Sequence, residues 1–277
     1  MNKINFIAAD GALGDTLAIT AAVKKLYELH NEKISVATRY PDIWENNPYV
    51  NEILQYEYNT YYSKNISPCR TWDCNIIQNC FNQLGLKYNK NILPELYLSN
   101  DEILYSKDIL KNYESNKKIA VCLNSSADIR DIRYHNILPL LKKLKKLDYK
   151  LISISKYSSI KYSYNNQIVY DIENIFDKNL NNTTLREIFS IINECDLYLG
   201  VDTGLFQASV ALNKPQVVFF TNNGCINNAY KNTKYVQSNT ECSNACRIAP
   251  LSNCMANNRC MDNFDLDMYL NLIKKIL

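Results

Sequence analysis

The chain has 277 residues, of which 47% are hydrophobic and 21% charged, and its formal net charge is +3. This length suits one large domain or two of about 100–150 residues, and the composition is that of an ordinary soluble globular protein. The charge is too small to indicate a nucleic-acid partner, and no apolar run approaches the ~20 residues of a membrane span. Because no cleavable leader precedes the first predicted strand, we expect a cytoplasmic protein.

The first part of the chain alternates strand-like and helical patterns. A short apolar run leads into a glycine-bearing loop, after which apolar residues recur at helical spacing, and a second apolar run then completes a strand–helix–strand unit. The predicted elements are strands over 3–9, 32–37 and 49–54, a helix through Leu29, and helices over 74–84 and 101–113. A polar linker over 114–118 then predicts a domain boundary.

The second part repeats this alternation. The predicted elements are strands over 119–123, 150–155, 197–201 and 216–220, a polar loop over 124–133, and helices over 137–147, 184–195, 205–212 and 264–277. Two such series predict an α/β fold of two Rossmann-like domains, each with a parallel sheet, facing one another across a cleft. We place the domains at residues 1–114 and 115–262, followed by a C-terminal helix over 263–277.

The segment from Gly11 to Leu17 lies between the first strand and the first helix. Gly11 and Gly14 allow a tight turn and a close approach to a ligand, and the helix N-terminus that follows offers free N–H groups to an anion. Asp15 falls in the first turn, where the helix dipole favours its ionised form, so it is a candidate general base. The alternative is that Asp15 only caps the helix.

A second segment, over 199–212, joins a strand directly to a helix through Asp202, Thr203 and Gly204. The backbone N–H groups and the Thr203 hydroxyl are placed to hold a diphosphate at the helix N-terminus. Asp202 lies at the carboxyl end of a strand, where open α/β sheets place groups that contact ligands. The alternative is a capped strand–helix turn without a ligand.

Together these two segments resemble glycosyltransferase family 9, which includes the lipopolysaccharide heptosyltransferases. The resemblance rests on Gly-x-Leu-Gly-Asp-x-Leu near the start of the chain and Asp-Thr-Gly-Leu before a helix of small residues near its end. It implies the GT-B fold, an acceptor-side first domain and a donor-binding second domain. It also implies inverting, metal-independent transfer of a sugar such as heptose from a nucleoside diphosphate to a hydroxyl, with no catalytic cofactor.

The resemblance also assigns candidate roles to residues. Asp15 matches the general base, and Asp202, Thr203 and Gly204 match donor-contacting positions. In the polar loop, the candidate phosphate contacts are Ser125, Ser126, Arg130 and Arg133. An arginine is chemically suited to this place because the leaving nucleoside diphosphate gains negative charge in the transition state.

Gln207 stands where the family usually has histidine. Its amide can hydrogen-bond a phosphate or sugar oxygen but cannot carry a proton. The acceptor also stays open among a glycan, a lipid-linked saccharide and a protein, because residues 56–97 are unlike a standard acceptor domain. Two rivals therefore remain, a GT-B sugar-nucleotide epimerase and a non-catalytic nucleotide-sugar-binding or scaffold protein.

Four of the ten cysteines, Cys242, Cys246, Cys254 and Cys260, lie within one short segment. Four thiolates can close a tetrahedral site for zinc or iron, which in a reducing compartment outranks disulfides. The cluster is similar to the four-cysteine iron site of the protein-heptosylating branch of the family. We expect a structural metal that pins the C-terminal helix and builds a contact in a homo-oligomer, with free thiols or two disulfides as the alternatives.

A lysine-rich stretch over 140–150 has its leucines at helical spacing. It predicts either a solvated helix face or a peripheral contact with the inner membrane surface, as an enzyme with a lipid-linked acceptor would make. Cys122 and Cys195 lie in apolar surroundings and are expected to be buried. His30 and His135 are expected at the solvated surface or the edge of the core.

Overall fold

In this computed structural model, the described residues are 6–57, 64–68, 74–126, 128–132, 134–155, 159–160, 170–171, 173–180, 182–221, 224–236, 238, 240 and 260–277. The first domain contains a parallel four-stranded sheet in the order β3-β2-β1-β4. Its strands are β1 (Phe6–Ala9), β2 (Ile34–Thr38), β3 (Val50–Gln55) and β4 (Lys64–Ile66).

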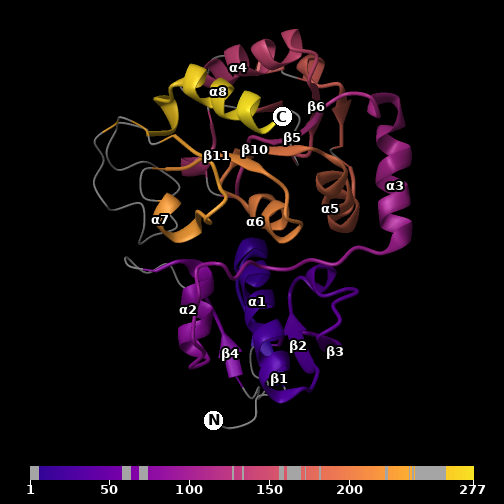
Figure 1. Ribbon diagram of the computed structural model, residues 1–277, viewed down its shortest axis with the longest axis vertical. Helices are drawn as coiled ribbons and strands as arrows, with labels where there is room; N and C mark the ends of the chain where they lie inside the picture. The colour runs from indigo at the N-terminus through magenta and orange to yellow at the C-terminus, as the bar shows by residue number, and fades with distance from the viewer. Residues whose placement is uncertain are drawn as a thin grey trace.

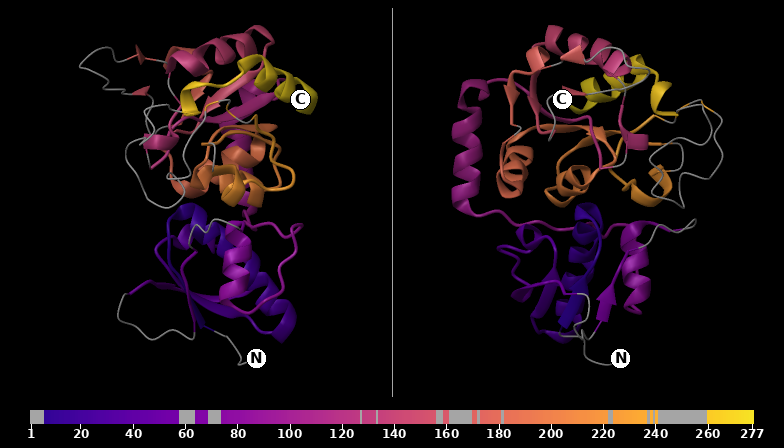
Figure 2. Two further views of the ribbon diagram at one scale, coloured as in Figure 1. Left: turned by 90° about the vertical axis from the view of Figure 1, so that its left-hand side faces the viewer. Right: turned by 180° about the vertical axis from the view of Figure 1, so that it is seen from behind.

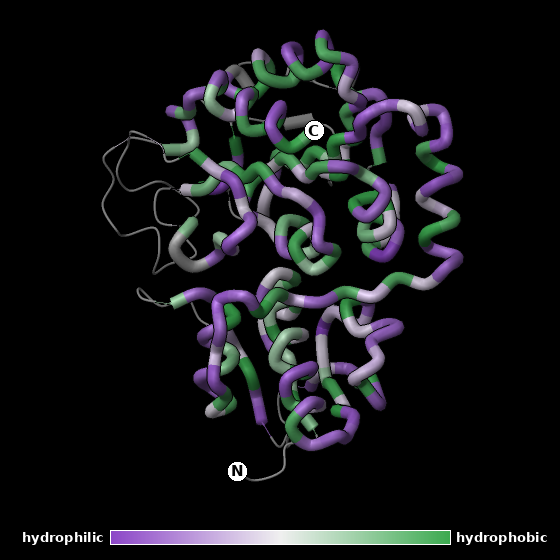
Figure 3. Tube along the Cα trace, in the orientation of Figure 1, coloured by the Kyte–Doolittle hydropathy of each residue, from purple (hydrophilic) through white to green (hydrophobic). Residues whose placement is uncertain are grey.

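Helix α1 (Leu13–His30) follows β1 and is the central helix of the first domain. Its residues from Thr16 to Val23 are all buried, so it is covered on nearly every side rather than along one stripe. Helix α2 (Ile76–Gln83) packs beside it, and the short 3-10 helix η1 (Pro41–Ile43) joins β2 to β3. The colouring of Figure 3 shows how apolar the N-terminal half of α1 is.

The second domain contains a parallel five-stranded sheet in the order β11-β10-β5-β6-β9. Its strands are β5 (Lys118–Cys122), β6 (Lys150–Ser153), β9 (Lys178–Asn179), β10 (Leu197–Val201) and β11 (Gln216–Phe219). Strands β5, β10 and β11 are buried along their whole length, as expected for a parallel sheet that helices cover on both faces.

The helices of the second domain form two layers (Figures 1 and 2). On the face away from the first domain, α4 and α8 pack together over one apolar cluster. On the other face, α5 and α6 lie between the sheet and the first domain. The bounds are α4 (Tyr134–Lys146), α5 (Leu185–Glu194), α6 (Gly204–Ala211), α7 (Gly224–Asn228) and α8 (Leu266–Ile276).

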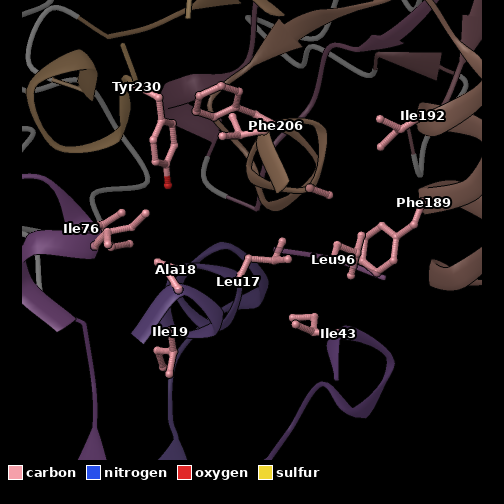
Figure 4. Packing of buried hydrophobic residues seen from close by; sticks show 14 of the residues in the cluster. Leu17, Ala18, Ile19, Ile43, Ile76, Leu96, Phe189, Ile192, Phe206 and Tyr230 are labelled. Carbon is pink, nitrogen blue, oxygen red and sulfur yellow. The ribbon is translucent and has the colours of Figure 1, made fainter. Parts of the chain in front are cut away.

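The two domains meet through α1 and α6. One apolar cluster runs without interruption from the first domain through α5 and α6 to the second sheet. In Figure 4, Leu17 and Ala18 of α1 lie opposite Phe206 and Tyr230 of the second domain. Because the buried surface is shared, burial of apolar area stabilises the arrangement of the domains as well as each domain.

Helix α3 (Asn100–Leu110) follows the connection between the domains and packs against α5. Ser99 caps it, and the Glu102 side chain accepts from the Ser99 N–H at 2.6 Å. A 3-10 turn, η2 (Lys111–Tyr113), then leads into β5. The boundary after residue 114 stays a prediction.

The predicted fold class is confirmed, since the chain forms two parallel-sheet α/β domains. The patterns missed the shortest elements, which include β4, β9, α7 and the antiparallel pair β7 (Ser159–Ile160) and β8 (Tyr170–Asp171). Cys122 and Cys195 are buried as predicted, and burial raises the pKa of the Cys195 thiol to about 12.

The lysine-rich helix α4 buries its leucines Leu140, Leu141 and Leu144. Lys143 pairs with Asp267 of α8, and Lys145 pairs with Asp177, each at 2.5 Å. These contacts suit a solvated helix face, and a membrane contact stays a prediction. Within the described part of the chain, every helix is too short or too polar to cross a membrane.

Candidate functional site

A cavity of about 380 Å³ lies between the two domains and is lined by residues of both. In the first sheet, the chain order reverses between β1 and β4, and in the second between β5 and β10. The loops that follow β1, β5 and β10 all line the cavity. In open α/β folds, ligands bind at such reversal points. The topology of both domains therefore indicates this cavity as the candidate ligand-binding site.

Asp15 lines the cavity from the first turn of α1, and its Oδ2 accepts a hydrogen bond from the Ala12 N–H at 3.0 Å. Gly11 precedes it with φ +142°, and a Cβ there would lie 2.6 Å from the Asp15 Cβ. Only glycine leaves room for this turn. The Asp15 carboxylate thus accepts a hydrogen bond within the first turn of its own helix and also lines the cavity, and its role toward a ligand stays a prediction.

Gly14 of α1 and Gly204 of α6 lie where these two helices pack closely against each other. A Cβ on Gly14 would lie 3.1 Å from Gln207 and 3.5 Å from the Gly204 Cα, and one on Gly204 would lie 2.6 Å from the Leu13 side chain. The first turns of both helices therefore open on the same cavity. The N-termini of both helices direct partial positive charge toward the cavity.

Thr203 fixes the start of α6. Its Oγ1 accepts a hydrogen bond from the Leu205 N–H at 3.1 Å and a longer one from the Phe206 N–H at 3.4 Å. The Thr203 hydroxyl is therefore largely occupied as a helix cap. The Gly204 N–H, one of the orphan donors of the first turn, lies at the cavity wall.

Asp202 is 3% exposed and its carboxylate is held by two side chains. The Asn228 Nδ2 donates to its Oδ2 at 2.7 Å, and the Arg130 Nη1 lies 3.7 Å from the same oxygen. Arg130 Nη1 also donates to the Asp202 carbonyl at 3.0 Å. Asp202 therefore fixes the Arg130 guanidinium at the cavity wall, where its planar group is suited to contact an anion.

The loop after β5 forms the next part of the wall with Asn124, Ser125 and Ser126. The Ser125 N–H donates to Asp131 at 2.6 Å, which fixes the loop. The Asn124 Oδ1 is buried and has no hydrogen-bond partner among the described residues. Beneath them lies Cys122, where burial raises the thiol pKa, so this sulfur is a neutral part of the wall.

Gln207 lies one turn into α6 and is 3% exposed. Its Oε1 accepts a hydrogen bond from the Tyr230 hydroxyl. Opposite it, the first domain closes the cavity with Tyr40 and Ile76. The wall is therefore asymmetric: the second domain supplies amide, hydroxyl and guanidinium donors, and the first supplies Asp15 and apolar surface.

The structure brings together most of the residues predicted for this site. Those that line the one cavity are Gly14, Asp15, Ser125, Ser126, Arg130, Asp202, Thr203, Gly204 and Gln207. Arg133, Cys242, Cys246 and Cys254 lie outside the described residues. Cys260 lies in a different apolar cluster, with α4 and α8, and does not line the cavity.

Sequence reasoning missed several cavity residues. Asn124 falls in the predicted polar loop and could have been named from its place directly after a strand. Tyr40 follows the second strand in the same way. Ile76 and Asn228 carry no local signal, because they reach the cavity only through the packing of α2 and α7. The same is true of Tyr230, which does not line the cavity but contacts Gln207.

Comparison with known proteins identifies the family of the chain. The family model for glycosyltransferase family 9 (heptosyltransferase) matches residues 79–253. A search of curated proteins finds no significant match. The family match covers more than half of the chain and includes the loops after β5 and β10.

Solved structures share the fold. A family 9 glycosyl transferase from Veillonella parvula has a TM-score of 0.74 at 10% identity, with 100% of this chain and 98% of that chain covered. The E. coli ADP-heptose lps heptosyltransferase II has a TM-score of 0.68 at 13% identity, with 99% and 98% covered. The iron-containing dodecameric glycosyltransferase TibC from E. coli has a TM-score of 0.64 at 13% identity, with 96% and 67% covered.

The family model covers more than half of the chain, and the two parallel sheets have the fold of the solved relatives. The chain therefore belongs to glycosyltransferase family 9, the heptosyltransferase family, and is a glycosyltransferase with the GT-B fold.

Proposed function

We propose that this enzyme transfers a sugar from a nucleoside diphosphate to an acceptor hydroxyl with inversion at the anomeric carbon, and that heptose is the sugar. The observation that carries the proposal is the cavity of about 380 Å³ between the domains, where hydrogen-bond donors of the second domain lie with the Asp15 carboxylate of the first. The named relatives support the choice of sugar, since one is an ADP-heptose lps heptosyltransferase and a TibC structure contains ADP-D-beta-D-heptose.

The donor diphosphate is assigned to the second domain. Arg130, Gly204 and Gln207 line the cavity and supply a guanidinium that is paired with Asp202, a helix N-terminus and a neutral amide donor. Ser125 and Ser126 add hydroxyls. Asp202 acts through Arg130, because its carboxylate is already held by Asn228 and the guanidinium. These groups would stabilise the charge that develops on the leaving diphosphate.

Asp15 is assigned as the general base. Its carboxylate takes the proton from the acceptor hydroxyl as that oxygen forms a bond to the anomeric carbon. The bond from the anomeric carbon to the diphosphate oxygen breaks at the same time, and its electron pair leaves with the nucleoside diphosphate. Attack from the side opposite the leaving group inverts the centre, and it suits a base in the first domain and a donor in the second.

The acceptor is assigned to the side of the first domain, next to Tyr40 and Ile76. A sugar hydroxyl of a glycan or lipid-linked saccharide and a side-chain hydroxyl of a protein present the same nucleophile to Asp15. We place the reaction in the cytoplasm, with α4 available for peripheral contact at the inner membrane surface. Lys142 and Lys146 of that helix are exposed.

We also propose a structural zinc or iron ion, outside the chemistry, held by Cys242, Cys246, Cys254 and Cys260. Of these, the structure describes Cys260, which is 5% exposed and lies in η6 (Cys260–Asp262), directly before α8. No group of three or more metal-binding side chains occurs among the described residues. A buried thiol at the start of α8 fits a metal that fixes this helix, and the iron-containing, dodecameric TibC supports both the metal and a homo-oligomer.

The test of the proposed function is a thermal-shift screen with ADP, GDP, UDP and CDP, followed by transfer assays with the matching nucleotide sugars. A nucleotide that binds only the native state raises the melting temperature as its concentration increases. We expect a shift with ADP and formation of ADP from ADP-heptose when an acceptor is present. No shift with any of the four nucleotides would contradict the donor site.

A further inference from the structure

The segment from Gly224 to Tyr230 supports the back of the donor wall. It contains α7 and two following residues, and it supplies two buried side chains, Asn228 and Tyr230, at 4% and 7% exposure. Asn228 donates to the Asp202 carboxylate, and Tyr230 donates to the Gln207 amide oxygen. One segment that follows β11 thus contacts both Gln207 of α6 and Asp202, which lies just before α6.

The contact with Tyr230 determines which way the Gln207 amide faces. A glutamine amide has an acceptor end and a donor end. The oxygen is engaged by the Tyr230 hydroxyl, so the NH2 end is left for the cavity. Among the described residues, this nitrogen has no hydrogen-bond partner. Gln207 lines the cavity, so this NH2 group is placed to donate to an anionic ligand there.

Tyr230 is itself well fixed. Its ring packs against Phe206, with 6.1 Å between the ring centroids, and its N–H donates to the Thr233 hydroxyl at 3.2 Å. Burial raises the pKa of the Tyr230 phenol well above its ordinary value, so the hydroxyl keeps its proton and stays a donor. Figure 4 shows this hydroxyl directed toward α1, beside Ile76.

We propose that Tyr230 is a positioning residue that holds the Gln207 amide with its NH2 group toward the donor diphosphate. The inference rests on the proposed function, because it deepens the assignment of the donor site. Without the Tyr230 hydroxyl, the amide is free to rotate and present its oxygen to the phosphate, which repels it. Tyr230 would therefore contribute to donor affinity without touching the donor.

The test measures ADP affinity by isothermal titration calorimetry for wild type, Tyr230→Phe, Gln207→Ala and the double variant. We expect Tyr230→Phe to weaken ADP binding about 3–10-fold, the range of one neutral hydrogen bond. Gln207→Ala should weaken it at least as much. If Tyr230 acts through Gln207, the double variant should bind ADP no more weakly than Gln207→Ala alone.

Tyr269→Phe is the matched control. The Tyr269 hydroxyl is also buried in the second domain, where it donates to the Val218 and Val236 carbonyls, but Tyr269 does not line the cavity. This variant should lose stability while keeping wild-type ADP affinity. A melting temperature for each variant separates a loss of folded protein from a loss of affinity.

Two results would overturn the role of Tyr230 without affecting the donor site. One is wild-type ADP affinity in Tyr230→Phe. The other is that Tyr230→Phe weakens ADP binding as much in the Gln207→Ala background as in wild type. Wild-type protein that binds none of the four nucleoside diphosphates would overturn the donor site itself, and the role of Tyr230 with it. The two failures are therefore distinguishable in one set of titrations.

Discussion

Arg186 and Glu102 form a two-pronged ion pair that joins α5 to α3. The Arg186 Nε donates to Oε1 at 2.5 Å, and the Nη2 donates to Oε2 at 2.6 Å. The same guanidinium donates to the carbonyls of Asp42 and Tyr97, each at 2.8 Å. One side chain of the second domain thereby binds α3, the connection between the domains and the turn η1 of the first domain.

Replacing Arg186 with methionine should destabilise the fold strongly. Arg186 is 7% exposed, so its loss leaves the Glu102 carboxylate without its ion-pair partner, and two carbonyls without a donor. Breaking a buried pair from one side costs about 3–5 kcal/mol, measurable by urea denaturation. The control is Lys111→Met, which removes an exposed pair with Asp108 and should change stability by less than about 0.5 kcal/mol. Equal stability of both variants would contradict this stabilising role of Arg186.

The same pair predicts a pH dependence of stability. Burial acts to raise the pKa of Glu102, but hydrogen bonds from Arg186 and the Ser99 N–H outweigh it, so the pKa lies below its ordinary value. A depressed carboxyl pKa contributes stability above the unfolded value of about 4.3, and the contribution is lost as pH falls through the folded value. Wild type should therefore exceed Glu102→Gln in unfolding free energy at pH 7, and the difference should shrink in acid. If the stability difference between wild type and Glu102→Gln grew on acidification, the pKa of Glu102 would be raised rather than lowered in the folded protein.

Asp15→Asn separates the base from the helix cap. Asparagine keeps an oxygen that can accept from the Ala12 N–H, so the melting temperature should change little. It cannot take a proton, so turnover should fall by a factor on the order of 10²–10⁴ while ADP affinity is largely kept. The measurement is steady-state transfer with a calorimetric titration of the same sample. Unchanged turnover would leave Asp15 as a cap alone.

Gln207→His should make donor binding depend on pH. Histidine has an unperturbed pKa near 6.5, and its cation attracts a diphosphate more strongly than the neutral ring does. ADP affinity of the variant should fall as pH rises from about 5.5 to 8, relative to wild type over the same range. Parallel pH profiles for the two proteins would mean that position 207 does not contact the diphosphate.

The cysteine segment predicts a bound metal. Purified protein should contain about one equivalent of zinc or iron by elemental analysis, and Cys254→Ser should lower both the metal content and the melting temperature. ADP affinity at low temperature should survive, because Cys260 lies away from the cavity. Cys74→Ser, at the start of α2, is the control and should keep the metal. Metal-free wild-type protein with four free thiols would rule the site out.

The alternation of apolar strands and amphipathic helices was enough to predict the fold class. Strong patterns, such as the run over 216–220 that is apolar after Gln216 and became β11, predicted their elements within one or two residues. The three-residue strand β4 was missed because it is too short to show alternation, and its sequence Lys-Asn-Ile has one buried position. Pairing with β1, rather than propensity, makes it a strand.

The site was predictable where chemistry is local to a strand–helix turn, as at Asp15 and Thr203. It was not predictable where a contact depends on packing between distant elements. Gly14 and Gly204 each look like ordinary helix-start glycines, and only the packing of α1 against α6 shows that they meet. Tyr230 is similar, since nothing around it in sequence indicates a hydrogen bond to an amide on α6.

The contact between α1 and α6 also has a consequence for how the protein is made. α1 is complete early in synthesis, but α6 begins only at Gly204. At about 5–20 residues per second, α1 waits roughly 10–40 s on the ribosome for the helix that covers it. Its apolar flank is open to other chains during that interval. Chaperones that cover this flank during synthesis would therefore raise the yield of folded protein.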